Sequence, residues 1–372
     1  MSEKLTVKNV VNINKSTLSS KENWSTLKYL DTGNITENQI DTLQIFQKGE
    51  KLPSRAKRKV EKGTIIYSTV RPNQKHFGYF DTYSDDLVVS TGFATLDVID
   101  PRVNSKYLYY LLTQNSVISQ LQSIGENSTS SYPSIRPEDI GNLSFMFPDI
   151  DIQNKIADIL TSIDKKIQIN NQINQELEAM AKTLYDYWFV QFDFPDQNGK
   201  PYKSSGGKMV YHPELKREIP EGWGVEKLGE LIQLERGVTY AKSDIVEKTT
   251  KDAIGVLRAT NITGNVMDLN DLVYLPKDKI NNKQIIKQNE TLIVMSSGSK
   301  EHLGKNAINY YEEVIGFGAF CSKIVPQKYS NYINTFLQST EFKGYLLKQS
   351  MGTNINNLTN SDILRSEEHT SE

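Results

Sequence analysis

Residues 151–192 read DIQNKIADILTSIDKKIQINNQINQELEAMAKTLYDYWFVQF, and neither Gly nor Pro interrupts them. From Ile152 to Tyr187, apolar residues recur at alternating steps of four and three. This spacing is typical of a helix that buries one stripe against another helix. In the middle the strict register falls on Lys166 and Asn170. The segment therefore predicts one continuous helix, roughly 54 Å long at 1.5 Å per residue.

Two interpretations of this helix are open. It could be a long core helix of an ordinary domain, but its faces are too rich in Asn, Gln, Lys and Glu for burial on all sides. We favour a rigid spacer that separates the segments at its two ends. The apolar residues expected to pack against a partner helix are Ile156, Ile159, Ile163, Ile173, Leu177, Met180 and Leu184.

The composition places limits on the function. The chain has 372 residues, of which 24% are charged, and a formal net charge of −2, so any surface that binds anions must be local. The single cysteine, Cys321, excludes an internal disulfide framework and fits a reducing cytosol. No apolar run has the length of a membrane span, and the N-terminus lacks the apolar core of a signal peptide. We therefore expect a cytoplasmic protein that does not enter a membrane.

Two β-rich regions on either side of the helix match each other. Short stretches recur in the same order at a nearly constant offset of 224 to 227 residues, which indicates a tandem duplication. The matched pairs are Leu30–Thr36 with Leu257–Thr263, Thr64–Thr69 with Thr291–Ser296, Gly92–Phe93 with Gly316–Phe317, Tyr107–Leu112 with Tyr332–Leu337, and Ser123–Gly125 with Ser350–Gly352. In the first half, strands are expected near 27–29, 64–70, 87–89 and 93–99, and a helix over 107–122.

The repeat divides the chain into five parts. In the first half, residues 139–148 lead into the long helix, whereas in the second half Asp362–Leu364 is followed only by the polar residues 365–372, which match nothing in the first half. The density of Pro and Gly between 193 and 222 predicts a connecting segment without its own core. The expected parts are residues 1–148, 149–192, 193–222, 223–364 and 365–372.

A basic segment offers a surface for nucleic acid. Residues 51–76 carry eight Lys or Arg and one Glu, a formal charge of +7, and this density attracts phosphate. Arg pairs with guanine, and Asn or Gln with adenine. The polar loops that follow Gly125 and Gly352, residues 127–132 and 353–357, can read bases or simply be solvated. The residues expected to contact DNA are Arg55, Lys57, Arg58, Lys59, Ser68, Arg71, Asn73, Gln74, Lys75, Ser296, Ser297, Lys300, Thr353 and Asn354.

No catalytic constellation is found in the sequence. The four histidines have no carboxylate, serine or metal-ligand spacing around them, so we expect no catalytic residue, no metal and no cofactor. Gly298–Lys305 fails as a phosphate-binding loop, because five residues separate its glycines and Asn306 replaces Ser or Thr. A self-sufficient DNA methyltransferase is disfavoured by the lack of any Pro-Pro pair. A scaffold whose helix recruits other proteins stays open.

Three stretches resemble the specificity subunits of type I restriction–modification systems. Residues 219–231, IPEGWGVEKLGEL, are similar to the opening of a target-recognition domain of that family. Residues 186–194, DYWFVQFDF, resemble the end of its central helix, and residues 148–166 resemble the entry to that helix. Members of the family have a second helix after the second domain, and here residues 365–372 stand in its place. This departure affects the expected assembly with partner subunits more than the expected DNA recognition.

The resemblance implies an α+β fold with two mixed α/β target-recognition domains, internally repeated and joined by a long coiled-coil-type helix. Each domain would read one half of a bipartite site in double-stranded DNA. Modification subunits, which methylate adenine using S-adenosylmethionine, and ATP-driven restriction subunits would be the partners, and the specificity subunit would carry no chemistry itself. With no second helix to cover the apolar stripe, we also expect self-association through the spacer helix.

Overall fold

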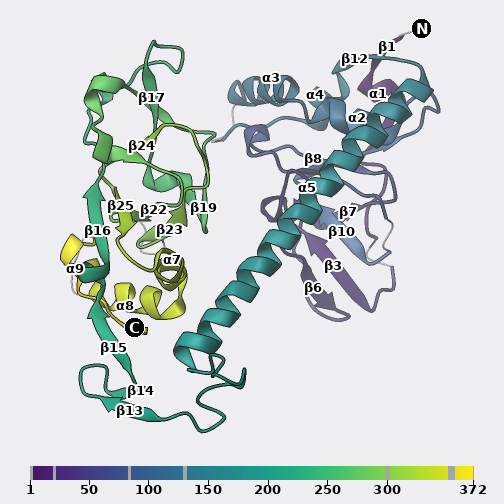
Figure 1. Ribbon diagram of the computed structural model, residues 1–372. Helices are drawn as coiled ribbons and strands as arrows, with labels where there is room; N and C mark the ends of the chain where they lie inside the picture. The colour runs from purple at the N-terminus through teal and green to yellow at the C-terminus, as the bar shows by residue number, and fades with distance from the viewer. Residues whose placement is uncertain are drawn as a thin grey trace. The chain divides into compact units, whose positions relative to one another are not determined.

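The long helix exists as one element. In the computed structural model, which describes residues 3–19, 22–82, 85–128, 132–298, 302–350 and 357–371, helix α5 (Ile150–Tyr185) runs unbroken for 36 residues (Figure 1). It continues into a π-helical turn, η3 (Asp186–Val190). The chain forms two compact units, residues 1–171 and 172–372, so α5 begins in unit 1 and ends in unit 2. Among the described helices, none combines the length and the hydropathy needed to cross a lipid bilayer.

Unit 1 is built from two four-stranded sheets with the orders β6-β3-β10-β7 and β2-β11-β8-β9, and from two short ribbons, β1-β12 and β4-β5. The strands are β1 (Glu3–Thr6), β2 (Val11–Ile13), β3 (Thr26–Leu30), β4 (Ile35–Thr36), β5 (Gln39–Ile40), β6 (Gln44–Gln47), β7 (Ala56–Lys59), β8 (Ile65–Ser68), β9 (Phe77–Tyr79), β10 (Leu87–Ser90), β11 (Phe93–Val98) and β12 (Ser144–Phe147). The helices are α1 (Val7–Val10), α2 (Ser105–Leu112), α3 (Asn115–Glu126) and α4 (Pro137–Gly141), with 3-10 turns η1 (Thr32–Asn34) and η2 (Pro72–Gln74).

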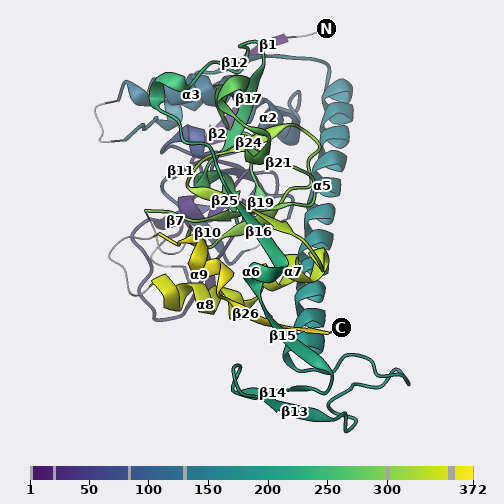
Figure 2. The same ribbon diagram turned by 60° about the vertical axis from the view of Figure 1, so that its left-hand side comes forward.

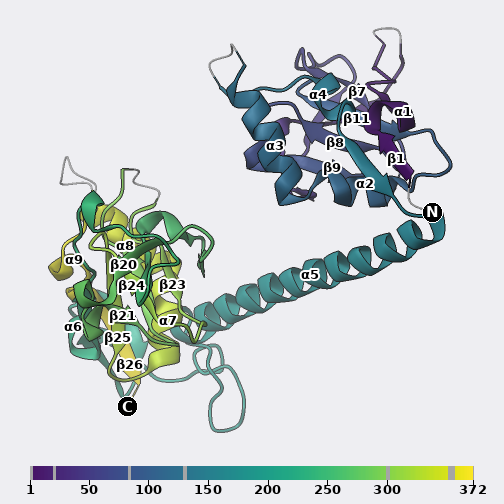
Figure 3. The ribbon, with the colours of Figure 1, turned by 90° about the horizontal axis from the view of Figure 1, so that it is seen from above.

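The core of unit 1 lies between its helices and the sheet that contains β8 and β9. Figure 3 shows α2 and α3 beside these strands. Ile65 and Tyr67 on β8 are buried against Leu108 of α2 and Leu121 of α3, and this burial is the main stabilising contribution. The four expected strands are confirmed. The single helix expected over 107–122 is wrong, because Gln114 takes an extended conformation and divides it into α2 and α3.

Unit 2 repeats this architecture and adds a hairpin between β13 and β14. Its strands are β13 (Met209–His212), β14 (Arg217–Pro220), β15 (Trp223–Lys227), β16 (Ile232–Arg236), β17 (Ala253–Leu257), β18 (Ile262–Thr263), β19 (Val266–Met267), β20 (Val273–Pro276), β21 (Ile285–Ile286), β22 (Thr291–Val294), β23 (Asn306–Ile308), β24 (Ile315–Phe317), β25 (Cys321–Pro326) and β26 (Glu367–Ser371). The helices are α6 (Leu228–Leu231), α7 (Ser330–Gln338), α8 (Thr340–Ser350) and α9 (Asn360–Leu364), with 3-10 turns η4 (Lys242–Asp244), η5 (Ala259–Asn261), η6 (Lys277–Lys279) and η7 (Asn282–Gln284).

The tandem duplication is confirmed by the sheet topology. The orders β20-β17-β24-β21 and β16-β25-β22-β23 in unit 2 repeat those of unit 1 strand for strand. The central strand pair of one sheet, β3–β10 or β17–β24, is parallel in both units. The recurring Asn-Ile-Thr forms the same 3-10 turn and short ribbon in each, with Ile35 and Ile262 buried at the matching position.

The strand register corrects two of the sequence matches. Phe93 pairs with Ser68 and Cys321 with Val294, so Gly92–Phe93 corresponds to Phe320–Cys321 and not to Gly316–Phe317, which lie in β24. In the same register Ile65 pairs with Leu96, and Thr291 pairs with the equivalent residue, Ile324. Thr291 therefore corresponds to Ile65, and the match of Thr64 with Thr291 is wrong by one residue. The match of Ser123–Gly125 with 350–352 extends outside the described residues.

The expectation that residues 365–372 match nothing in the first half is wrong. Residues 367–371 form β26, antiparallel to β15 (Figure 2), just as β12 pairs with β1 in unit 1. The short helices α4 and α9 precede these strands in the same way. Because strand pairing uses backbone hydrogen bonds, two dissimilar sequences can occupy equivalent places.

The segment 193–222 is more structured than its Pro and Gly content predicts. Phe194 stacks on Tyr202 with ring centroids 4.8 Å apart, and on Trp223 at 5.1 Å. Hydrogen bonds from the hydroxyl and N–H of Ser204 lower the pKa of Asp193. Aromatic stacking and a capped turn therefore replace the core that the segment lacks.

Candidate nucleic-acid interface

Three loops meet at one place in unit 1, which we call the three-loop junction. They are the loop after β8 (residues 69–76), the turn between β10 and β11 (Thr91 and Gly92), and the described part of the loop after α3 (residues 127–128 and 132–135). Arg71 N–H donates to Pro133 O at 2.8 Å and Ile135 N–H to Thr69 O at 2.9 Å. Thr69 N–H donates to Gly92 O, also at 2.9 Å. The basic loop and the polar loop after Gly125, which the sequence treats separately, thus lie side by side.

Gly125 is required where the third loop turns back. A Cβ atom added there would lie 3.0 Å from the backbone nitrogen of Ser134, which itself donates to Gly125 O at 3.3 Å. Only a residue without a side chain lets these two backbones approach so closely. The glycine after α3 therefore has a structural role in shaping the junction.

The basic strand β7 is connected to the same junction. Thr91 N–H donates to Arg55 O at 2.9 Å, so the Thr91–Gly92 turn joins Arg55 on one side to Thr69 on the other. Arg55 and Lys57 are exposed, and no carboxylate in the described part of the chain forms an ion pair with either. Because both side chains are exposed, these two cations are open to a phosphate backbone.

Arg71 directly precedes the 3-10 turn η2, which contains Asn73 and Gln74. Arg71 is exposed, adopts a left-handed conformation with φ of 47°, and its guanidinium lies 5.6 Å from the ring centroid of Tyr132 in the third loop. Asn73 and Gln74 are exposed, and the Asn73 N–H donates to Gln122 Oε1 at 3.2 Å. The cation–π contact and the backbone bond hold this turn in a fixed conformation while its polar side chains face solvent.

Four of the residues expected to contact DNA are either ion-paired within the domain or at least half-buried. Lys59 pairs with Glu22 at 2.6 Å and Lys75 with Glu37 at 2.5 Å, which reduces the positive charge that they offer to DNA. Arg58 is half-buried, and burial lowers its pKa. Ser68 is a correction: it is 1% exposed, and its hydroxyl is hydrogen-bonded to both backbone groups of Val70, so we remove it from the interface.

Unit 2 forms an equivalent three-loop junction with different side chains. Leu358 N–H donates to Met295 O at 2.7 Å, and Met295 N–H donates to Phe320 O at 2.9 Å. These two bonds correspond to those from Ile135 N–H to Thr69 O and from Thr69 N–H to Gly92 O in unit 1. Ser296 and Asn357 form a strand-like bridge and a side-chain hydrogen bond. Ser296 and Ser297 are both partly exposed there. Lys300, Thr353 and Asn354 lie outside the described residues.

Sequence reasoning missed one exposed aromatic residue at this junction. Phe320 occupies the place of Gly92 and is 66% exposed. The signal was hidden because the Gly-Phe pair of the first half was matched to Gly316–Phe317, four residues upstream. The register of β25 against β22 was needed to find it.

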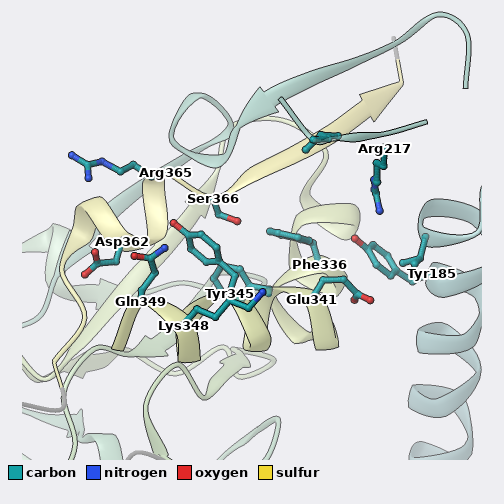
Figure 4. Close-up of a pocket in the computed structure, with 13 residues that line it drawn as sticks. Tyr185, Arg217, Phe336, Glu341, Tyr345, Lys348, Gln349, Asp362, Arg365 and Ser366 are labelled. Atoms are coloured by element: carbon teal, nitrogen blue, oxygen red, sulfur yellow. The ribbon is translucent and has the colours of Figure 1, made fainter. Parts of the chain in front are cut away.

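A cavity elsewhere in unit 2 is a competing site. It has a volume of about 720 Å³ and lies between the end of α5, the β13–β14 hairpin, α8 and α9 (Figure 4). Its charged lining residues are of both signs: Arg217, Glu341, Lys348, Asp362 and Arg365. None of the expected DNA contacts lines it, and the mixed charge gives no preference for an anion such as phosphate. The three-loop junctions are the better candidates.

The first half of the chain is similar to one family of known proteins. Residues 2–179 match the family model described as "Type I restriction modification DNA specificity domain". The HindI specificity subunit of Haemophilus influenzae is 36% identical over 190 residues, which are 50% of this chain and 40% of the relative. The MjaIX specificity subunit of Methanocaldococcus jannaschii is 30% identical over 227 residues, 60% of this chain and 46% of the relative. The chain thus spans less than half the length of either relative.

Solved structures show a similar fold. The S subunit of a type I restriction–modification system from M. genitalium superimposes with a TM-score of 0.50 over 100% of this chain and 85% of that one, at 15% sequence identity. At this identity the similarity concerns the fold alone. It agrees with the mixed helix and strand architecture described above.

Proposed function

We propose that this chain, whose residues 2–179 match the DNA specificity domain of type I restriction–modification systems, recognises a bipartite sequence in double-stranded DNA. Each unit reads one half of the target through its three-loop junction. The chain supplies recognition and no catalytic step. Methylation and cleavage belong to partner subunits.

The duplicated junction is the observation that supports this function most strongly. Two domains with the same strand order present the same three loops, yet the side chains there differ between them. Arg71 stands where unit 2 has Ser297, and Gly92 where unit 2 has Phe320. A common scaffold with different loop side chains is what two readers of different base sequences require.

Reversing the two unpaired cations of the basic strand should weaken binding to DNA of any sequence. We expect Arg55→Glu with Lys57→Glu to lower affinity for a mixed-sequence duplex roughly tenfold or more, because two phosphate contacts become repulsive. The slope of log affinity against log salt should become shallower by about two. Fluorescence anisotropy of a labelled duplex, titrated at several salt concentrations, measures both quantities.

The matched control is Lys200→Glu with Lys203→Glu, which changes charge equally on exposed residues of the connecting segment. This control should keep the salt slope of the unmodified chain. Arg58 is left unchanged in both proteins, since a half-buried charge reversal there would also affect folding. Equal slopes in all three proteins would show that the basic strand does not contact DNA.

The proposed partners are modification subunits and restriction subunits. Relatives such as the HindI and EcoKI proteins are named as specificity subunits of type I restriction enzymes, which supports an assembly of this kind. In such an assembly this chain positions the other subunits on DNA and holds no cofactor itself. We also propose a cytoplasmic location, where a single cysteine stays reduced.

The apolar stripe of α5 is proposed to mediate self-association. Ile156 does not belong to the open part of this stripe, because it packs against the core of unit 1 beside the buried Ala157. The other six expected residues are between 46% and 67% exposed: Ile159, Ile163, Ile173, Leu177, Met180 and Leu184. Burying each such side chain is worth roughly 1.5–3 kcal/mol, so pairing with the α5 of a second copy is favourable. A two-fold axis would bury the same stripe on both copies.

Interrupting the stripe should therefore prevent association. We expect the unmodified chain to sediment as a dimer or larger species at micromolar concentration, and Ile163→Asp with Leu177→Asp to sediment as a monomer. Gln175→Asp, on an exposed position outside the stripe, is the control and should not change the species. An unmodified chain that stays monomeric across a dilution series, with its helix content intact, would contradict self-association.

A further inference from the structure

The turn between β24 and β25 holds an exposed aromatic ring on a rigid backbone. Phe320 O accepts hydrogen bonds from Met295 N–H at 2.9 Å and from Ser296 N–H at 3.2 Å. The turn is closed by a bond from Cys321 N–H to Gly318 O at 2.9 Å. The ring of Phe320 is nevertheless 66% exposed. Its position is therefore fixed by the backbone and not by burial of the side chain.

A second loop supports this turn. Ala319 N–H donates to Val238 O at 2.9 Å, and Gly318 forms a bridge with Val238. A side chain at Gly237 would collide with the Gly318 carbonyl, so only glycine permits this close packing. The extra support restricts the turn further and points to a need for a precise position of the residue at its tip.

The equivalent turn in unit 1 carries no aromatic residue, because Gly92 stands at that place. There the exposed ring comes from the third loop, where Tyr132 is 39% exposed beside Arg71. Among the described residues, each three-loop junction thus presents one aromatic ring, from a different loop in each unit. The two rings differ in position relative to the shared scaffold, as residues that read different bases would.

We propose that Phe320 contacts a base of the second half-site directly, either the methyl group of a thymine or the face of an unstacked base. The proposal rests on the proposed function. Apolar side chains discriminate thymine through its methyl group, and aromatic rings stack on bases or wedge between them. A rigid ring makes either contact with little loss of conformational entropy.

The surroundings of Phe320 favour DNA over a protein partner. Its carbonyl accepts from Ser296 and from the buried Met295, and its turn holds the small residues Gly318 and Ala319. An aromatic anchor for a protein partner usually sits in an apolar patch that excludes water. A base edge, by contrast, requires hydrogen-bonding groups, and Ser296, whose N–H donates to Phe320 O, carries a hydroxyl bonded to Asn357.

Selection from a pool of randomised duplexes tests the proposal with the full chain. The sequences bound by the unmodified chain are compared with those bound by Phe320→Ala, Phe320→Tyr and the control Tyr211→Ala, whose ring on β13 is 61% exposed. Phe320→Ala should lose roughly tenfold or more of its base preference at one or two positions in one half of the motif. Phe320→Tyr, which keeps the ring, and Tyr211→Ala should both select the original motif.

Failure of this inference differs from failure of the proposed function. An unmodified chain that enriches no motif contradicts the proposed function itself. If the unmodified chain selects a motif and Phe320→Ala selects the same motif, the role of Phe320 is overturned. A loss of base preference spread evenly over both halves of the motif also overturns it. Because the side chain is exposed, Phe320→Ala should keep the melting temperature of the unmodified chain, and a lowered one would assign the residue to folding.

Discussion

Trp223→Ala is expected to lower the free energy of unfolding of unit 2 by roughly 3 kcal/mol. Trp223 is the residue on which the aromatic side chains at the end of α5 converge. The ring centroid of Phe194 lies 5.1 Å away in a stacked arrangement, that of Phe192 5.7 Å away edge-on, and that of Phe189 5.9 Å away. Each such pair contributes roughly 0.5–1.5 kcal/mol beyond the area that it buries. Denaturant unfolding followed by circular dichroism measures the loss.

Trp188 provides the matched control. It is also a half-buried tryptophan of this region, but its described ring contact is with Phe189 alone, at 6.4 Å. Trp188→Ala should therefore cost clearly less than Trp223→Ala, and Trp223→Phe should recover part of the loss. Equal losses in the two alanine variants would mean that the aromatic cluster is not organised around Trp223.

Gln153→Ala is expected to destabilise unit 1 by about 2–4 kcal/mol. Gln153 is fully buried in the first turns of α5. Its Oε1 accepts from Asn104 N–H at 3.0 Å, and its Nε2 donates to Arg102 O and Pro148 O, both at 2.8 Å. Alanine would leave one donor and two acceptors, all partly buried, without this partner, and unsatisfied groups shielded from water are costly.

The neighbouring residue is the control for Gln153. Asn154 is exposed and makes one described side-chain bond, from Asn104 Nδ2 to its Oδ1 at 2.8 Å, so Asn154→Ala should cost under about 1 kcal/mol. Hydrogen exchange should also show faster exchange at the start of α5 in Gln153→Ala. Unchanged exchange there, with an unchanged unfolding midpoint, would show that water replaces the lost bonds without penalty.

The long helix and the repeat could be predicted from the sequence because both are periodic signals. Thirty-six residues without Gly or Pro and with a four-three apolar spacing leave few alternatives to a helix. Asn34–Thr36 and Asn261–Thr263 recur because the same 3-10 turn and ribbon need the same residues twice. Signals of this kind depend on neighbours in the chain.

The composition of the interface could be predicted only in part, because it depends on contacts between distant residues. The charge of 51–76 indicated a basic surface, but the partners of Lys59 and Lys75 are Glu22 and Glu37, 37 and 38 residues away. The burial of Ser68 depends on its strand being central in a sheet, and the position of Phe320 depends on strand register. Neither is visible in a linear pattern.

The pattern of bases that the unmodified chain selects from a randomised duplex pool tests the central claim most directly. Two structurally equivalent junctions on one chain predict a motif of two conserved blocks separated by a fixed number of base pairs that show no preference. A charge reversal in the basic strand should weaken binding without changing either block. A single conserved block, two blocks at variable spacing, or no enrichment at all would contradict the account of two domains that each read one half-site.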